Sequence, residues 1–223
     1  MNRRLVAGLL AAIALGGCTL FPDLSGIRKK EYTLYAPSAA APVVQFEKNG
    51  KPSKSSAILR VVNLSVPVWL NSTNIYYQLE YRNGGEIAPY SQARWVSSPA
   101  ILIRLLVQNT LAEDPFWKAV IGPESLAQAD YKVELRITDF QQVFIKPDQS
   151  KGLLRAFATL VDNEAGVMVA QREFRFETLA PSADVEGGTL ALSKNAYKLA
   201  QAVRSWLRQV VATREQPDDI PDV

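Results

Sequence analysis

The runs DYKVELRITDFQQVFIK (130–146), GLLRAFATLVD (152–162) and VMVAQREFRFETL (167–179) decide the fold of this chain. Each run alternates apolar and polar side chains with the period of two that is typical of a β-strand. The turn residues NEAG (163–166) separate the last two runs. The three runs therefore predict an antiparallel meander.

The residues after the meander predict a long helix that packs on this sheet. Gly187 and Gly188 open a segment that extends to about Thr213, with apolar residues at steps of four and three. A coiled-coil seam has a similar spacing, but about three heptads that contain a Trp and an Ala fit docking on a sheet better. The apolar stripe consists of Leu192, Ala196, Leu199, Val203, Trp206 and Val210.

Two further strands and a long connection are expected upstream. Residues 31–35 (EYTLY) alternate, and residues 57–66 (AILRVVNLSV) are apolar on both faces, as in a strand that is covered on both sides. Pro67 is expected to end the second strand. Residues 36–56 are rich in Pro, Ser, Lys and Ala and predict a flexible excursion outside the core.

A hairpin and a helix are expected between these strands and the meander. Residues 74–81 (NIYYQLEY) and 86–90 (EIAPY) flank Asn-Gly-Gly and predict a projecting ribbon at the edge of the sheet. Residues 99–111 follow Ser98, a candidate N-cap, and are apolar on nearly every side, which predicts a mostly buried helix after Trp95. The predicted fold class is α/β (or α+β), a single-domain sandwich with a central mixed sheet of about five or six strands.

Composition limits the chemistry available to the chain. Its 223 residues, 48% hydrophobic and 21% charged, fit one globular domain, and it contains no His. The usual Ser and Cys triads and the commonest zinc ligand are therefore excluded. No nucleotide-binding or hydrolase motif is visible, and the adjacent carboxylates Glu113–Asp114 and Asp218–Asp219 are expected to be solvated. We expect no catalytic residue, cofactor or metal, although an enzyme that uses distant carboxylates or Ser stays open as an alternative.

The N-terminus predicts a secretory signal peptide over residues 1–17. Two Arg precede eleven apolar residues, which span only about half of the roughly 30 Å membrane core. The run closes on Leu15, Gly16, Gly17 and Cys18, which resemble a bacterial lipobox, with Cys18 as the acylated residue; the alternative is an ordinary signal peptide with an incidental Cys. Two or three acyl chains would anchor the protein stably. In the lipoproteins that this motif resembles, Asp directly after the modified Cys signals retention in the inner membrane; Thr19 stands at that position here, so the resemblance implies the outer membrane.

The mature chain should carry no strong charge and no disulfide. Removing residues 1–17 lowers the formal charge from +3 to about +1, so a nucleic-acid partner is not expected. Cys18 is the only cysteine. The basic residues 28–30 either meet anionic head groups or belong to a solvated tether. The expected organisation is signal peptide 1–17, acylated Cys and tether 18–30, domain 31–213 and acidic flexible tail 214–223.

Several motifs behind the lipobox occur in a characteristic order. Tyr32 and Leu34 form a Y-x-L strand, a strand ends in a Pro followed by an apolar-Leu pair, and an aromatic-x-x-x-x-Trp motif enters the first helix. In this order they resemble the ABC-type transport auxiliary lipoproteins, which include the PqiC (YmbA)-like lipoproteins. The positions that match are Pro67, Trp69, Leu70, Tyr90, Arg94, Trp95, Phe140 and Trp206.

The resemblance implies a function in transport between two membranes. It implies a periplasmic lipoprotein that works with an ATPase, a permease and an MCE-domain (mammalian-cell-entry) protein to move phospholipid or another hydrophobic solute. The domain would dock this system at the outer membrane, and an oligomer would match an oligomeric partner. The alternative is an outer-membrane assembly or envelope-structural lipoprotein without a transporter partner.

Aromatic residues give the sequence its candidate interface. Trp69 and Trp95 are expected in the core. Only one of the adjacent strand residues Tyr76 and Tyr77 can face inward, so this pair is a candidate partner interface. A polar loop at 48–56 and the Tyr-rich hairpin at 75–90 depart from the family pattern, and leave the identity of the partner open.

Overall fold

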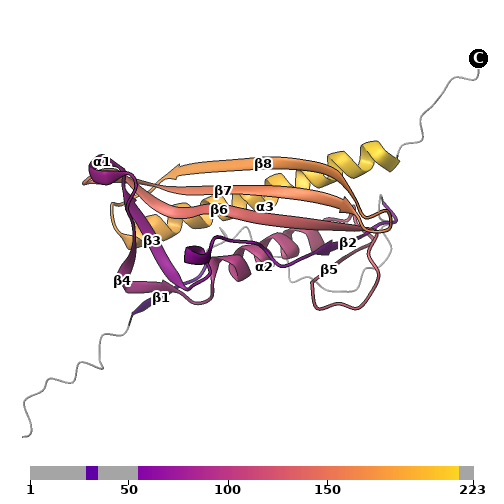
Figure 1. The fold of residues 1–223 in the computed structure, drawn as a ribbon, viewed down its shortest axis with the longest axis horizontal. Helices are drawn as coiled ribbons and strands as arrows, with labels where there is room; N and C mark the ends of the chain where they lie inside the picture. The colour runs from indigo at the N-terminus through magenta and orange to yellow at the C-terminus, as the bar shows by residue number, and fades with distance from the viewer. Residues whose placement is uncertain (1–28, 35–54, 216–223) are drawn as a thin grey trace, which may run out of the picture.

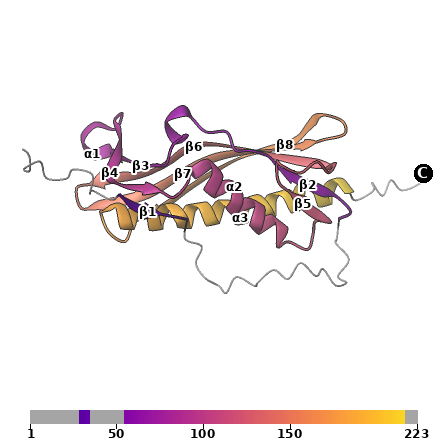
Figure 2. The same ribbon diagram turned by 90° about the horizontal axis from the view of Figure 1, so that it is seen from below.

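The protein consists of one mixed β-sheet with two long helices on one face (Figures 1 and 2). The computed structural model describes residues 29–34 and 55–215, so the predictions for the signal peptide and for Leu15–Cys18 lie outside it, as do most of the 36–56 excursion and most of the 214–223 tail. At the described end of the excursion the prediction is wrong, because Ser55 is buried and its backbone N–H donates to the carbonyl of Phe116, and residues 214 and 215 belong to the last helix. The helices are α1 (Glu80–Asn83), α2 (Pro99–Ala112) and α3 (Val185–Glu215), with a short 3-10 turn η2 (Val68–Leu70). The strands are β1 (Lys30–Tyr32), β2 (Ile58–Val61), β3 (Asn74–Leu79), β4 (Ile87–Trp95), β5 (Ala119–Ile121), β6 (Tyr131–Lys146), β7 (Gln149–Asp162) and β8 (Val167–Leu179).

Strand β6 is the central strand of the sheet. On one side it pairs with β7 in antiparallel register from Tyr131 opposite Asp162 to Lys146 opposite Gln149. On its other side it pairs in parallel with β2 near its start and with β3 near its end. The sheet then continues from β3 to β4 and β1, and from β2 to β5. The α/β prediction is confirmed, with eight strands in place of the five or six expected.

The predicted meander is confirmed by β6, β7 and β8. Strand β8 pairs antiparallel with β7 from Lys151 opposite Leu179 to Asp162 opposite Val167. The turn between them places Gly166 at φ +67°, a conformation that only Gly adopts easily. Alternate residues of β7 are buried, as the period of two requires.

The predicted C-terminal helix is α3, which starts two residues before Gly187. Its apolar stripe is buried against the sheet, except for the half-buried Val210, so the coiled-coil alternative does not hold. The helix crosses the sheet closely at Gly152, where an added Cβ would lie 2.9 Å from the backbone C of Ala191 and the backbone N of Leu192. The absence of a side chain at Gly152 therefore sets the distance between α3 and β7.

The predicted edge ribbon is wrong in its position. Strands β3 and β4 do form a hairpin, with the short helix α1 in its turn, but β3 also pairs with β6 and β4 also pairs with β1. Strand β3 is thus inside the sheet, whereas β4 is covered by β1 only at Ala93–Trp95. The sequence shows the local turn but not the distant strand on the other side of β3.

Three other expectations need correction. Helix α2 is buried on one face only, since Ile101 and Leu105 are 46% and 42% exposed. Strand β2 ends at Val61, well before Pro67, and alternates between buried and half-buried residues in place of being covered on both sides. The first strand is Lys30–Tyr32, and β5 was not predicted because three residues carry no recognisable periodicity.

Candidate functional site

The predicted interface residues Tyr76 and Tyr77 each pack against other aromatic rings. The ring of Tyr76 meets Trp69 edge-on at 5.1 Å between centroids, and its hydroxyl is 3.4 Å from that of Ser72. The ring of Tyr77 packs against Tyr90 at 4.8 Å and against Phe144 at 6.1 Å. Both tyrosines are half-buried. Each therefore shows solvent only part of its ring.

A buried polar network lies below Tyr90. Its hydroxyl donates to Oε1 of Gln142 at 2.8 Å, and Nε2 of Gln142 donates to Oγ of Ser150 at 2.7 Å and to the carbonyl of Asp184 at 3.0 Å. Burial raises the pKa of Tyr90, with a smaller contribution from Tyr77, so its hydroxyl stays a donor at physiological pH. The network ties β4 and β6 to the residue before α3.

Strand β1 is fastened to the start of α3. Nζ of Lys30 lies 2.8 Å from Oε1 of Glu186, and the Tyr32 hydroxyl donates to the same oxygen at 2.7 Å. These two hydrogen bonds lower the pKa of Glu186 to about 2, and burial together with the Glu186 contact raises the pKa of Tyr32 to about 12. Glu186 also lies in the first helical turn, where a negative charge is favourable.

A second ion pair holds the other face of the same strand. Nη2 of Arg94 in β4 lies 2.5 Å from Oε1 of Glu31. We name Lys30, Glu31, Tyr32, Arg94 and Glu186 the tether clamp. It fastens β1 to both β4 and the start of α3.

Most of the remaining motif residues build the core. Trp95 is 1% exposed and packs on Phe140 at 5.6 Å. Leu70 is buried, Pro67 precedes η2, and Trp69 is half-buried against the core. The two core predictions for tryptophan thus hold fully for Trp95 and partly for Trp69.

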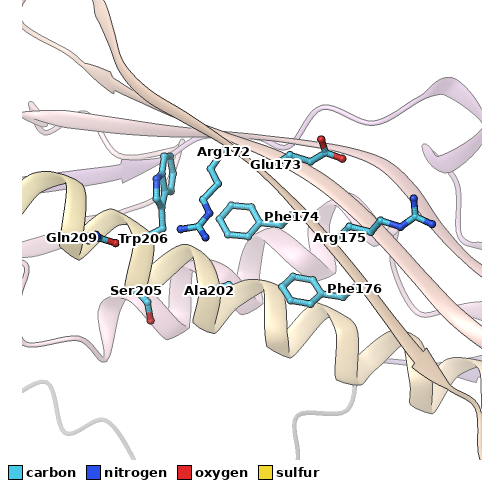
Figure 3. A pocket seen from close by; sticks show the side chains of 9 residues that line it. All are labelled: Arg172, Glu173, Phe174, Arg175, Phe176, Ala202, Ser205, Trp206 and Gln209. Carbon is cyan, nitrogen blue, oxygen red and sulfur yellow. The ribbon is translucent and has the colours of Figure 1, made fainter.

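Trp206 lies at the side of a groove between β8 and α3 (Figure 3). The groove measures about 420 Å³ and is lined on the strand by Arg172, Phe174 and Phe176 and on the helix by Ala202 and Trp206. Phe174 and Trp206 meet edge-on at 6.1 Å. The groove therefore has an apolar floor beside charged residues of both signs, Arg172, Glu173 and Arg175.

The described residues contain no group of three or more His, Cys, Asp or Glu that could hold a metal ion. Asp114 was predicted to be solvated, which is wrong: its side chain is 1% exposed, accepts from the backbone N of Phe116 at 3.0 Å and lies 3.5 Å from Arg208. It closes the turn after α2, and Glu113 is exposed as expected. Among the described helices, none is long and apolar enough to cross a membrane.

Sequence reasoning missed the tether clamp and the groove. A Glu in the first turn of a helix is a visible signal, but its partners are more than 150 residues away. The groove was signalled by the alternation of Phe and charged residues at 172–177, which was used only to predict a strand.

Comparison with known proteins supports the fold and the family. No curated protein sequence matches the chain significantly. A crystal structure of a Xanthomonas campestris protein assigned to the family DUF330 superposes with a TM-score of 0.67 at 18% identity, covering 75% of this chain and 93% of that one. A crystal structure of an uncharacterized protein superposes with a TM-score of 0.61 at 14% identity, covering 81% and 99%. At these identities the likeness shows the fold alone. The sequence pattern of one family matches residues 32–204, which confirms the resemblance drawn from the motifs: the chain belongs to the ABC-type transport auxiliary lipoprotein components.

Proposed function

We propose that this auxiliary lipoprotein docks an MCE-type ABC transporter at the inner leaflet of the outer membrane. Its partners would be an MCE-domain protein, a permease and an ATPase, and the cargo phospholipid or another hydrophobic solute. Membership of the transport auxiliary family supports a transporter partner. The sequence Leu15-Gly16-Gly17-Cys18-Thr19 supports acylation of Cys18 and sorting to the outer membrane.

The tether clamp is the observation that carries the proposal. Lys30 is held by Glu186, and only residues 19–29 separate it from Cys18. Eleven residues extend over at most about 36–40 Å, so an acylated Cys18 keeps the β1 end of the sheet within that distance of the membrane. A domain restrained in this way suits a docking role, because it stays beside the membrane while its other surfaces remain free.

We assign no reaction to the chain. The family is one of transport components. The half-buried rings of Tyr76 and Tyr77 are proposed as part of the docking surface, together with Val68, which precedes Trp69 in η2 and is 93% exposed. Aromatic and apolar side chains of this kind are common anchors at protein interfaces.

The decisive experiment is affinity purification of the full-length protein from gently solubilised envelopes, with mass spectrometry of the proteins and lipids that co-purify. Cys18→Ala is the control for acylation. Recovery of an MCE protein with its permease and ATPase supports the assignment, and bound phospholipid extends the role to cargo handling. Recovery of outer-membrane assembly factors or peptidoglycan alone refutes it and supports the structural alternative.

Membrane sorting is tested separately. Thr19→Asp should move the protein from the outer to the inner membrane, and Thr19→Ser should not. Deleting the protein should impair outer-membrane integrity while the ATPase activity of the inner-membrane complex is retained. Loss of both would contradict a docking role.

A further inference from the structure

Strand β8 leaves a long edge of the sheet unpaired. Its thirteen residues pair with β7 on one side, and no described strand lies on the other. The other open edges among the described residues are those of β1 and β5, which have three residues each, and that of residues 87–92 of β4, which include Pro89 and so lack one N–H donor. An unpaired strand of this length presents a row of free N–H and C=O groups to another chain.

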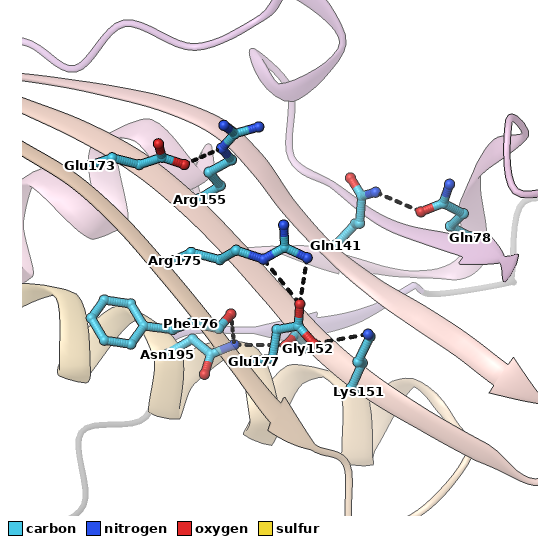
Figure 4. Close-up of polar contacts among 10 residues, drawn as sticks. All are labelled: Gln78, Gln141, Lys151, Gly152, Arg155, Glu173, Arg175, Phe176, Glu177 and Asn195. Atoms are coloured by element: carbon cyan, nitrogen blue, oxygen red, sulfur yellow. Dashed lines mark hydrogen bonds and ion pairs between the residues drawn. The ribbon is translucent and has the colours of Figure 1, made fainter.

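The contacts of Asn195 show which backbone groups point outward. Its Nδ2 donates to the carbonyl of Gly152 in β7 at 2.8 Å and to that of Phe176 in β8 at 3.2 Å (Figure 4). One nitrogen reaches both carbonyls only if both point into the seam between the two strands. Because backbone groups alternate along an antiparallel strand, those of Glu173, Arg175 and Glu177 point to the free edge.

The side chains of these three residues form a mixed-charge row on the open face of the sheet (Figure 4). Glu173 pairs with Arg155 of β7 at 2.6 Å, and Glu177 pairs with Arg175 at 2.6 Å and with Lys151 at 2.9 Å. A row of one sign would repel a second copy. A row of alternating sign complements itself when it is reversed and shifted by one charged residue.

We propose that β8 pairs with β8 of a second copy in antiparallel register about a two-fold axis at Phe174. This register sets Glu173 opposite Arg175 of the second copy, and Arg175 opposite its Glu173. About eight backbone hydrogen bonds would form between residues 171 and 177 of the two strands. Both ion pairs join the existing charge row, which then runs unbroken across the interface.

Charge and length select this register over its neighbours. A two-fold axis at Glu173 or at Arg175 sets like charges opposite each other, which is unfavourable. An axis at Phe176 also matches opposite charges, but it leaves only residues 173–179 paired, whereas an axis at Phe174 pairs residues 169–179. Strand β1 and strand β5 are too short to serve as the partner.

The helix-facing side of the edge fits the same register. Phe174 would lie opposite its own copy, and Arg172 opposite Phe176. Arg172 already stacks over Phe174 at 5.5 Å, and no ion pair is found for it among the described residues. Its guanidinium would cover the ring of Phe176 in the second copy, and the apolar floor of the groove beside Trp206 would lose its contact with water.

The test measures the mass of the full-length lipoprotein by native mass spectrometry, after release of the detergent. The wild type should be a dimer or a multiple of one. Glu173→Arg sets Arg opposite Arg and Arg175→Glu sets Glu opposite Glu, so each variant alone should fall to half the wild-type mass. An equal mixture of the two variants restores both ion pairs, and it should return to the wild-type mass as a mixed pair.

Cysteine cross-linking checks the register independently. Gln171 lies opposite Glu177 of the second copy, so Gln171→Cys with Glu177→Cys should form a disulfide-linked dimer, while Gln171→Cys with Glu173→Cys should not. A monomeric wild type, single variants of unchanged mass, a mixture that stays monomeric, or cross-linking of the second pair only would each overturn the proposal. Equal thermal unfolding of the variants shows that they are folded. None of these outcomes depends on recovery of a transporter.

Discussion

Replacing Gly152 by Ala tests whether close packing of α3 on the sheet is the main constraint on the fold. The new Cβ would lie 2.9 Å from the backbone C of Ala191 and the backbone N of Leu192, and 3.1 Å from the Cβ of Ala191, where ordinary contacts are 3.4–4 Å. Two of these atoms are backbone, so no side chain can turn away. The helix must lift by several tenths of an ångström along a seam that also holds Asn195.

Overpacking of this kind costs about 1–3 kcal/mol. For a domain of this size that lowers the Tm by roughly 2–12 °C. The assay is reversible urea unfolding followed by circular dichroism. Gly84→Ala is the matched control, because the nearest atom to its new Cβ is 4.0 Å away and its φ is −61°. A Gly152→Ala protein with the stability of the control would show that α3 is not seated tightly on β7, and would refute the reasoning.

Three further substitutions test the contacts of other residues in α3. Asn195→Ala removes a buried side chain that bonds two carbonyls and a hydroxyl, and should cost about 1–3 kcal/mol in urea unfolding; a change within error would mean that water replaces it. Trp206→Ala empties the space beside Phe174 and should cost about 3–5 kcal/mol by the same assay, unless the groove closes over it. Glu186 has its pKa lowered to about 2 from 4.5, so its contact with Lys30 stabilises the fold above pH 4.5 and is lost as the pH falls from 4.5 to 2. The Tm difference between the wild type and Glu186→Gln should shrink over that pH range, and a constant difference would contradict the clamp.

The elements that were predicted correctly are those whose own sequence shows a clear period of apolar residues. Strands β6, β7 and β8 alternate over more than ten residues each, and one turn joins the last two, so their order and antiparallel pairing follow from the sequence. The stripe on α3 predicted its packing in the same way. These elements have enough residues for the period to stand out from chance.

The sequence did not show which elements that are far apart in the chain pair with each other. Strand β3 has the signature of a hairpin, and nothing in it states that β6 will pair with its other side. Helix α2 is apolar all round, which does not indicate that only the face with Ile103 and Val107 is covered. For the candidate site, Cys18 and the family motifs were visible, whereas the tether clamp joins residues at opposite ends of the chain.

The tether clamp and the free edge of β8 together restrict how a pair of copies would sit on a membrane. In the sheet, β1 and β8 are opposite edges of the series β1-β4-β3-β6-β7-β8. A two-fold axis through β8 that extends the sheet must run perpendicular to it, so the two β1 strands lie at opposite outer corners of the pair. With Cys18 acylated as proposed, each tether would reach at most about 40 Å, and the acyl groups of both copies would have to enter the same leaflet. Both conditions are met when the axis follows the membrane normal and the extended sheet lies parallel to the bilayer, which leaves one complete face of the pair turned toward the periplasm.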